Sequence, residues 1–195
     1  MASIDDKKGF ILEQEHRLAS RMALEVINRP TLNIWMILIP VVFVYYFYGL
    51  HRFSTGKKEF TKHFVDTRRL ILNEACSALE SGKKIDFREL ARHEQVPEDA
   101  VKAYVDWAKV LSDHYVKLLN TKGSDFKSLV QARYGELGSY LLILDQINKA
   151  ESRFYKALRK DLKHSVSDAG EVIKKMEKSL GHLRRDEARA AFSMS

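Results

Sequence analysis

Apolar side chains recur every three or four positions along much of this chain, a spacing that places them on one face of an α-helix. The clearest case follows Pro97, a residue that suits the start of a helix, and the helix dipole favours Glu98 and Asp99 in the first turn. The apolar stripe of this helix consists of Val101, Tyr104, Val105, Ala108, Leu111, Tyr115 and Leu118. Only three prolines and nine glycines occur. The sequence therefore predicts an all-α fold.

Residues 63–166 are expected to form a small helical bundle around this helix. One helix is predicted over residues 59–79, with its apolar side packed inward. A long helix is predicted to start near Ser124 and to run almost to the end of the bundle. Gly135 and Gly138 lower helix propensity by about 1 kcal/mol each, so they are expected to mark a bend or a close helix crossing.

Both ends of the chain are predicted to contact partner subunits. Residues 1–29 have the pattern of an amphipathic helix with balanced charge, which favours a protein partner over lipid, and Met22 and Val26 lie on its apolar face. Residues 167–195 carry few apolar anchors, so they are expected to form a marginal helix that docks as a tail. Trp107 lies beside the main stripe of its helix, where it could anchor a partner or complete the edge of the core.

Residues 30–50 contain no charged side chain and predict a transmembrane helix. At about 1.5 Å per residue they reach about 30 Å, the thickness of a bilayer's hydrocarbon core. Aromatic residues that are typical of membrane interfaces lie near the two ends, namely Trp35, Tyr45, Tyr46 and Tyr48. Pro40 lies in the middle, where a membrane helix can accept it with a kink. A re-entrant hairpin that turns at Pro40 is the alternative.

The net charge of +7 lies entirely after this apolar segment, because residues 1–50 hold equal numbers of basic and acidic side chains. A basic region next to an apolar segment favours an anionic membrane surface, although solubility alone could also explain it. The basic connector, residues 51–62, supplies the predicted lipid contacts Arg52, Lys57, Lys58 and Lys62. Basic residues are more frequent after the span than before it. This bias predicts a single-pass protein of the cell membrane with a cytoplasmic C-terminal domain.

Cys76 is the only cysteine, which excludes an internal disulfide and a thiolate metal cluster within the chain. Its apolar neighbours predict a buried, inert thiol. Glu13 and His16 form one E-x-x-H pair, but a di-iron bundle needs two such pairs and further carboxylates. Neither a phosphate-binding loop nor a nucleophile motif is present. We therefore expect no cofactor, no metal and no catalytic activity.

The stretch FRELARHEQVPEDAVKAYV resembles the helix-turn-helix pattern of DNA-binding proteins. The apolar positions that match are Leu90, Ala91, Val96, Val101 and Tyr104. Gln95 occupies the turn position where the family usually has glycine, and Glu98 and Asp99 would face the phosphates and repel them. These acidic residues argue against nucleic acid as a partner.

Together these features predict a non-catalytic, membrane-anchored accessory or scaffold subunit. Its expected partners are the membrane lipid bilayer and other protein subunits of a membrane complex. The alternative is a membrane-tethered regulator whose helix-turn-helix-like region binds nucleic acid.

Overall fold

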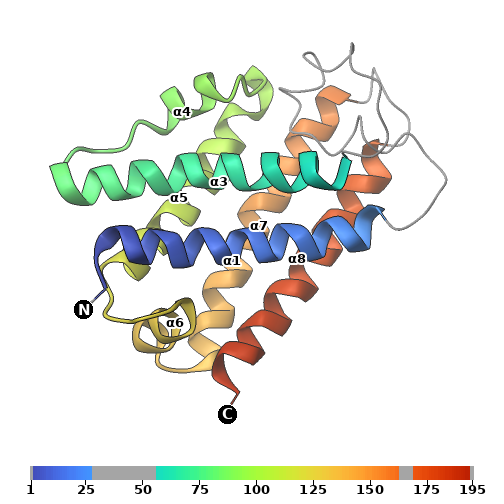
Figure 1. Ribbon diagram of the computed structural model, residues 1–195. Helices are drawn as coiled ribbons and strands as arrows, with labels where there is room; N and C mark the ends of the chain where they lie inside the picture. Colours follow the sequence, from blue (N-terminus) through green and yellow to red (C-terminus); the bar gives the residue numbers. More distant parts are fainter. Residues whose placement is uncertain (1, 28–55, 163–168, 194–195) are drawn as a thin grey trace.

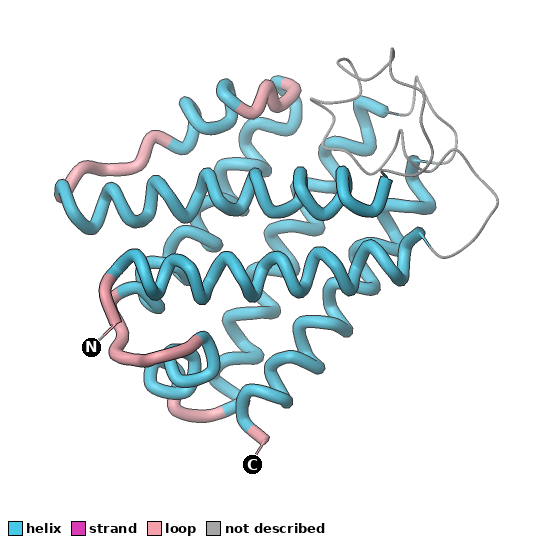
Figure 2. The backbone as a smooth tube through the Cα atoms, in the orientation of Figure 1, coloured by secondary structure: helices cyan, strands magenta, loops and turns pink. Residues whose placement is uncertain are grey.

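The computed structural model describes residues 2–27, 56–162 and 169–193, and these ranges contain seven helices and no strand. Figures 1 and 2 show them as a bundle of long helices joined by short loops. The helices are α1 (Ile4–Ile27), α3 (Gly56–Ser81), α4 (Phe87–His93), α5 (Glu98–Leu119), α6 (Phe126–Tyr134), α7 (Leu137–Leu162) and α8 (Ala169–Phe192). The prediction of an all-α helical bundle is confirmed.

Five long helices share one hydrophobic core. α1 packs against α3 and α8, α8 packs against α7, and α5 packs against α3 and α7. Trp107 is at the centre of an aromatic cluster in which its ring stacks on Phe154 at a centroid separation of 5.4 Å and meets Tyr104 edge-on at 5.7 Å. Burial of these large side chains supplies much of the hydrophobic driving force for packing.

The first helix, α1, is part of this bundle and not a separate segment. Its apolar face is covered by α3 and α8, and Ile11, Leu18 and Met22 are almost fully buried there. Met22, the predicted partner contact, is therefore buried within this chain. The periodicity of residues 1–29 correctly identifies an apolar face, but it cannot show whether that face packs within the chain or against another protein.

The helix α3 begins at Gly56, so much of the predicted connector 51–62 is helical. Phe60, Phe64 and Ile71 are buried, whereas Lys58 and Lys62 are exposed. The burial of Phe60 extends the core to the first turns of the helix, which explains why the described bundle begins before residue 63.

The long helix predicted from Ser124 consists of two helices. Asp125 caps α6, because its side chain accepts a hydrogen bond from the backbone N–H of Ser128 while the Ser128 hydroxyl accepts one from the Asp125 N–H. Gly135 ends α6 with φ of 71°, a left-handed conformation that glycine adopts without a steric penalty. The predicted bend is confirmed at Gly135. A Cβ at Gly138 would meet nothing closer than 3.7 Å, so that glycine does not mark a close crossing.

The last helix, α8, belongs to the core. It packs against α7 and α1, with Met176, Leu180, Leu183 and Ala188 buried. The predicted C-terminal helix is therefore packed within the bundle over its described part.

The predicted membrane segment, residues 30–50, lies outside the described residues. So do its interface residues Trp35, Tyr45, Tyr46 and Tyr48, and the basic residue Arg52. Of the helices described here, none combines the length and the apolar character that a membrane crossing requires.

Candidate functional site

α1 ends, and α3 begins, at the same end of the bundle (Figure 1). The two helices pack side by side and run in opposite directions. Near their other ends, the thiol of Cys76, late in α3, is close enough to Lys8 and Asp5, early in α1, for their charges to act on its pKa. Both flanks of residues 28–55 therefore emerge from one end of the bundle.

The same end receives the end of α7 and the start of α8 (Figure 1). It carries basic side chains from two helices, which we call the basic collar: Lys58 and Lys62 of α3, and Lys156, Arg159 and Lys160 of α7. Four of the five are exposed, and Arg159 is half-buried. No ion pair joins a collar residue to another part of the described chain. The collar is therefore available to an external anion.

Behind this end, a buried ion network connects α1, α3, α7 and α8. Arg68 of α3 places its Nε 3.1 Å from Glu15 Oε2 of α1, and its other side forms an ion pair with Glu151 of α7. Arg184 of α8 places its Nη1 2.8 Å from Glu151 Oε2. Arg68 and Glu151 each have side chains that are 2% exposed. Two arginines and two glutamates therefore balance each other's charges inside the bundle.

Two tyrosine hydroxyls add hydrogen bonds to the network. Tyr115 of α5 donates to Glu15 Oε1 at 2.8 Å, and Tyr155 of α7 donates to Glu151 Oε1 at 2.9 Å. The guanidinium carbon of Arg68 also lies 3.3 Å from the ring centroid of Phe64. Through Tyr115 the network includes α5, so it joins all five long helices of the described bundle.

The electrostatics of Glu151 show how the network holds buried charge. Burial alone would raise the pKa of Glu151, but Arg184 and Arg68 outweigh this effect and keep the pKa below its usual value. Removing one partner would leave an unpaired buried charge, which typically costs about 3–5 kcal/mol. The network therefore favours a single relative placement of the helices whose ends form the collar.

A second polar contact joins α1 to α8 at Glu187. Gln14 donates a hydrogen bond to Glu187 Oε2 at 2.6 Å, and Arg21 lies 3.5 Å from Glu187 Oε1. Burial raises the pKa of Glu187 to about 7, because the attraction of Arg21 only partly offsets the loss of solvation. This contact is therefore expected to titrate near neutral pH.

His114 links α5 to α6 and α7. Its Nδ1 lies 2.6 Å from the hydroxyl of Tyr134, and its ring stacks near those of Tyr134 and Tyr140. Burial lowers the pKa of His114 to about 3, so the imidazole is neutral in the folded protein at physiological pH. His114 acts in packing at this position.

The residues that the sequence predicts to contact lipid or a partner lie in different environments. Lys58 and Lys62 are exposed in the collar, and Lys57 lies between Gly56 and Lys58 but its side chain is outside the described set. Trp107 is 2% exposed, in agreement with the alternative that it completes the core. The side chain of Val26 also lies outside the described set.

Sequence reasoning missed the α7 half of the collar. Arg159 and Lys160 lie in the last turn of α7, where basic residues are common because they complement the helix dipole. Their charge was visible in the sequence, but only the packing of α7 with α8 and of α8 with α1 brings them to the end from which residues 28–55 emerge.

The helix-turn-helix resemblance has a structural counterpart in α4 and α5. Gln95 lies in the turn between them with φ of 51°, the left-handed conformation for which glycine is usually used. Pro97 occupies the N-cap position of α5, at the helix start that the sequence predicted. Glu98 and Asp99 are exposed in the first turn of α5. A short helix, a left-handed turn and a second helix therefore follow one another here, and the charge at the start of the second helix is acidic.

Comparison of the chain with protein-family models, with curated proteins and with solved structures gives no match. Among the described residues, no group of three or more histidine, cysteine or acidic side chains could hold a metal ion.

Proposed function

We propose that this chain is a membrane-attached, non-catalytic accessory subunit that holds partner proteins at an anionic membrane surface. The observation that carries the proposal is the antiparallel packing of α1 and α3, which brings both flanks of the apolar segment to one end of the bundle.

This packing favours a re-entrant path for residues 30–50 over one complete crossing. A single crossing would place α1 and α3 on opposite sides of a bilayer, where Glu15 and Arg68 could not meet at 3.1 Å. Two complete crossings would need about 40 apolar residues, because each takes about 20. We therefore propose that the segment enters and leaves the membrane on the same side and turns at Pro40.

The basic collar would provide a second attachment to the membrane. A lysine or arginine near an anionic surface contributes about 1 kcal/mol of attraction. Stable anchoring by a lipid chain generally needs a second signal, such as a polybasic patch. The helices that flank the apolar segment and the collar lie at the same end of the bundle, so we propose that the segment and the collar supply these two signals together. Because the cytoplasmic leaflet carries the anionic lipid, we place the bundle on the cytoplasmic side.

The ion network supports a positional role. Glu15, Arg68, Glu151 and Arg184 pair with one another, so their charges serve to orient the helices. A rigid bundle with a defined membrane-facing end can present its remaining surfaces to partner subunits in one orientation.

Vesicle flotation tests the proposal. Full-length protein should float with phosphatidylcholine vesicles more completely when phosphatidylglycerol is added. The double variant Lys156→Glu, Lys160→Glu should lower this lipid affinity by at least about tenfold. Lys83→Glu with Lys84→Glu is the matched control, because these exposed lysines follow the other end of α3. An equal loss of vesicle affinity in both double variants would contradict a specific role for the collar.

A membrane-tethered nucleic-acid-binding protein is the second candidate, and the left-handed turn at Gln95 between α4 and α5 favours it. The acidic residues Glu98 and Asp99 oppose it, because they would lie closest to the phosphates. Salt-sensitive binding of the full chain to duplex DNA would support this second function.

A further inference from the structure

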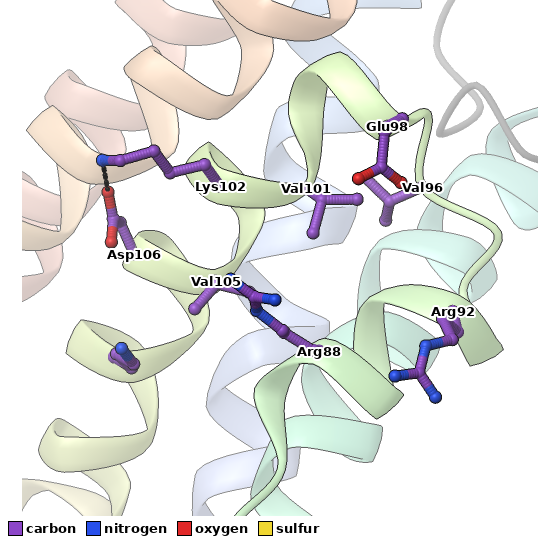
Figure 3. A pocket seen from close by; sticks show the side chains of 9 residues that line it. Arg88, Arg92, Val96, Glu98, Val101, Lys102, Val105 and Asp106 are labelled. Carbon is purple, nitrogen blue, oxygen red and sulfur yellow. Dashed lines mark hydrogen bonds and ion pairs between the residues drawn. The ribbon is translucent and has the colours of Figure 1, made fainter.

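A groove of about 590 Å³ lies between α4 and α5, on the surface of the bundle (Figure 3). Val96, Val101 and Val105 form its apolar part, and each is partly exposed. Val101 and Val105 belong to the apolar stripe of α5 and pack against the core, but they stay partly exposed, unlike the buried Tyr104 and Leu111. The groove therefore leaves apolar surface open at helical spacing.

Basic side chains surround these valines. Arg88 extends from α4 toward Val105 of α5 (Figure 3), and Lys109 lies one turn beyond Val105. Within the described chain neither Arg88 nor Lys109 forms an ion pair. Of the other basic residues at the groove, Arg92 pairs with Glu89, and Lys102 Nζ lies 3.1 Å from Asp106 Oδ2. Two exposed cations thus lie beside the apolar surface without an ion pair, although the charge of Arg88 also acts on Asp86 and lowers the pKa of that carboxyl.

We propose that this groove binds a short, acidic, amphipathic helix of a partner protein. Val101 to Lys109 spans about 12 Å of α5, which matches two to three turns of a bound helix. Apolar side chains one turn apart on the ligand would contact Val101 and Val105, as in other helix-in-groove complexes. Carboxylates flanking them would pair with Arg88 and Lys109. This inference names the partner's chemistry and rests on the proposed accessory function.

The groove suits a peptide better than it suits lipid or DNA. A bilayer surface is broad and cannot enter a groove between two neighbouring helices. DNA phosphates approaching the same surface would meet Glu98 and Asp106, which also line it. A peptide can place its carboxylates near the unpaired cations and keep them away from these two acids.

The test uses fluorescein-labelled synthetic peptides and full-length protein in a neutral detergent. The first peptide has about 14 residues, roughly four helical turns, with leucines one turn apart and glutamates beside them. A second replaces the glutamates with lysine, and a third replaces the leucines with serine. Fluorescence anisotropy should show binding of the first peptide, with at least about tenfold weaker binding of the other two.

Substitutions locate the interaction. Arg88→Glu and Lys109→Glu should each weaken binding of the acidic peptide by at least about tenfold. Arg133→Glu is the control, because Arg133 is exposed on α6, outside the groove, and it should leave affinity unchanged. All three substituted residues are exposed, so circular dichroism should show wild-type helix content for each variant. Equal binding of the acidic and lysine peptides, or unchanged affinity in Arg88→Glu, would overturn the proposal.

Two further probes separate this inference from the proposed function. Duplex DNA is the first probe. If it displaces the acidic peptide, and if Arg88→Glu loses affinity for this DNA, the groove binds nucleic acid and the peptide proposal is overturned. Arg88→Glu should float with vesicles as completely as the wild type does, because membrane attachment is assigned to the collar and Arg88 lies in the groove. Failure of flotation with intact peptide binding would contradict the membrane role alone.

Discussion

Arg68 and Glu15 meet inside the bundle, with Nε and Oε2 separated by 3.1 Å, although they belong to the two helices that flank the predicted membrane segment. This contact joins the middle of α3 to the middle of α1. It requires both helices to lie on the same side of any membrane that the intervening residues enter. Arg68 also pairs with Glu151, so the same side chain links the flanking helices to α7.

Replacing Arg68 with methionine should destabilise the protein by about 3–5 kcal/mol, because Glu15 loses its cation partner and Glu151 keeps only Arg184. Urea unfolding followed by circular dichroism measures this change. Arg92→Met is the control: its ion pair with Glu89 is exposed, so it should change stability by less than about 1 kcal/mol. A loss of similar size in both variants would show that the buried network has no special role.

His114 should make the protein less stable in acid. Its pKa is about 3 in the folded protein and near 6.5 when exposed, so between these values the unfolded chain binds the extra proton. Its contribution is fully present above about pH 6.5 and is lost as the pH falls toward 3. In His114→Phe the slope of unfolding free energy against pH should decrease by up to about 1.4 kcal/mol per pH unit in this window. Identical slopes would contradict the burial of a neutral imidazole.

Glu187 should make the protein less stable as the pH rises through neutrality, whereas His114 makes it less stable as the pH falls. Because its pKa is raised to about 7, the stability linked to its protonated form is fully present below about 4.5 and is lost as the pH rises through 7. Glu187→Gln keeps a neutral group beside Gln14. The variant should therefore gain stability relative to the wild type between about pH 5 and about pH 8, as thermal unfolding can measure. If instead it loses stability with rising pH, the ion pair with Arg21 dominates the contact.

Gln95→Gly should stabilise the turn between α4 and α5. A left-handed residue with a Cβ is strained by about 1–2 kcal/mol, while glycine adds entropy to the unfolded chain, so we expect a net gain of up to about 1 kcal/mol. Gln95→Ala retains the strained Cβ and is the matched control. Chemical denaturation compares the two. A glycine variant that is less stable than the alanine variant would show that the turn is not strained at this position.

Local patterns in the sequence predicted several features correctly. Pro97 precedes α5, Gly135 ends α6, and Cys76 is buried at 7% exposure. Each of these depends on neighbours within a few turns, so residue type and spacing are sufficient to indicate them. Burial also raises the pKa of the Cys76 thiol, in agreement with an inert cysteine.

Features that depend on distant residues could not be predicted in this way. Glu15, Arg68, Glu151 and Arg184 are far apart along the chain, and as isolated residues each has the appearance of an ordinary surface charge. The spacing of apolar residues puts Trp107 at the edge of the apolar stripe of its helix. In the folded protein its ring stacks on that of Phe154 of α7. The pairing of helix faces determines these contacts, and periodicity describes only one helix at a time.

The most direct test of the account is the topology of α1 and α3 in native membranes. In a Cys76→Ser background, Gly9→Cys would place a single thiol on α1, and Lys83→Cys would place one just after α3; both positions are exposed. A membrane-impermeant maleimide should label both thiols from the cytoplasmic face, in inside-out vesicles and not in right-side-out ones. Labelling of the two thiols from opposite faces would show one complete crossing between them and would contradict the proposed attachment.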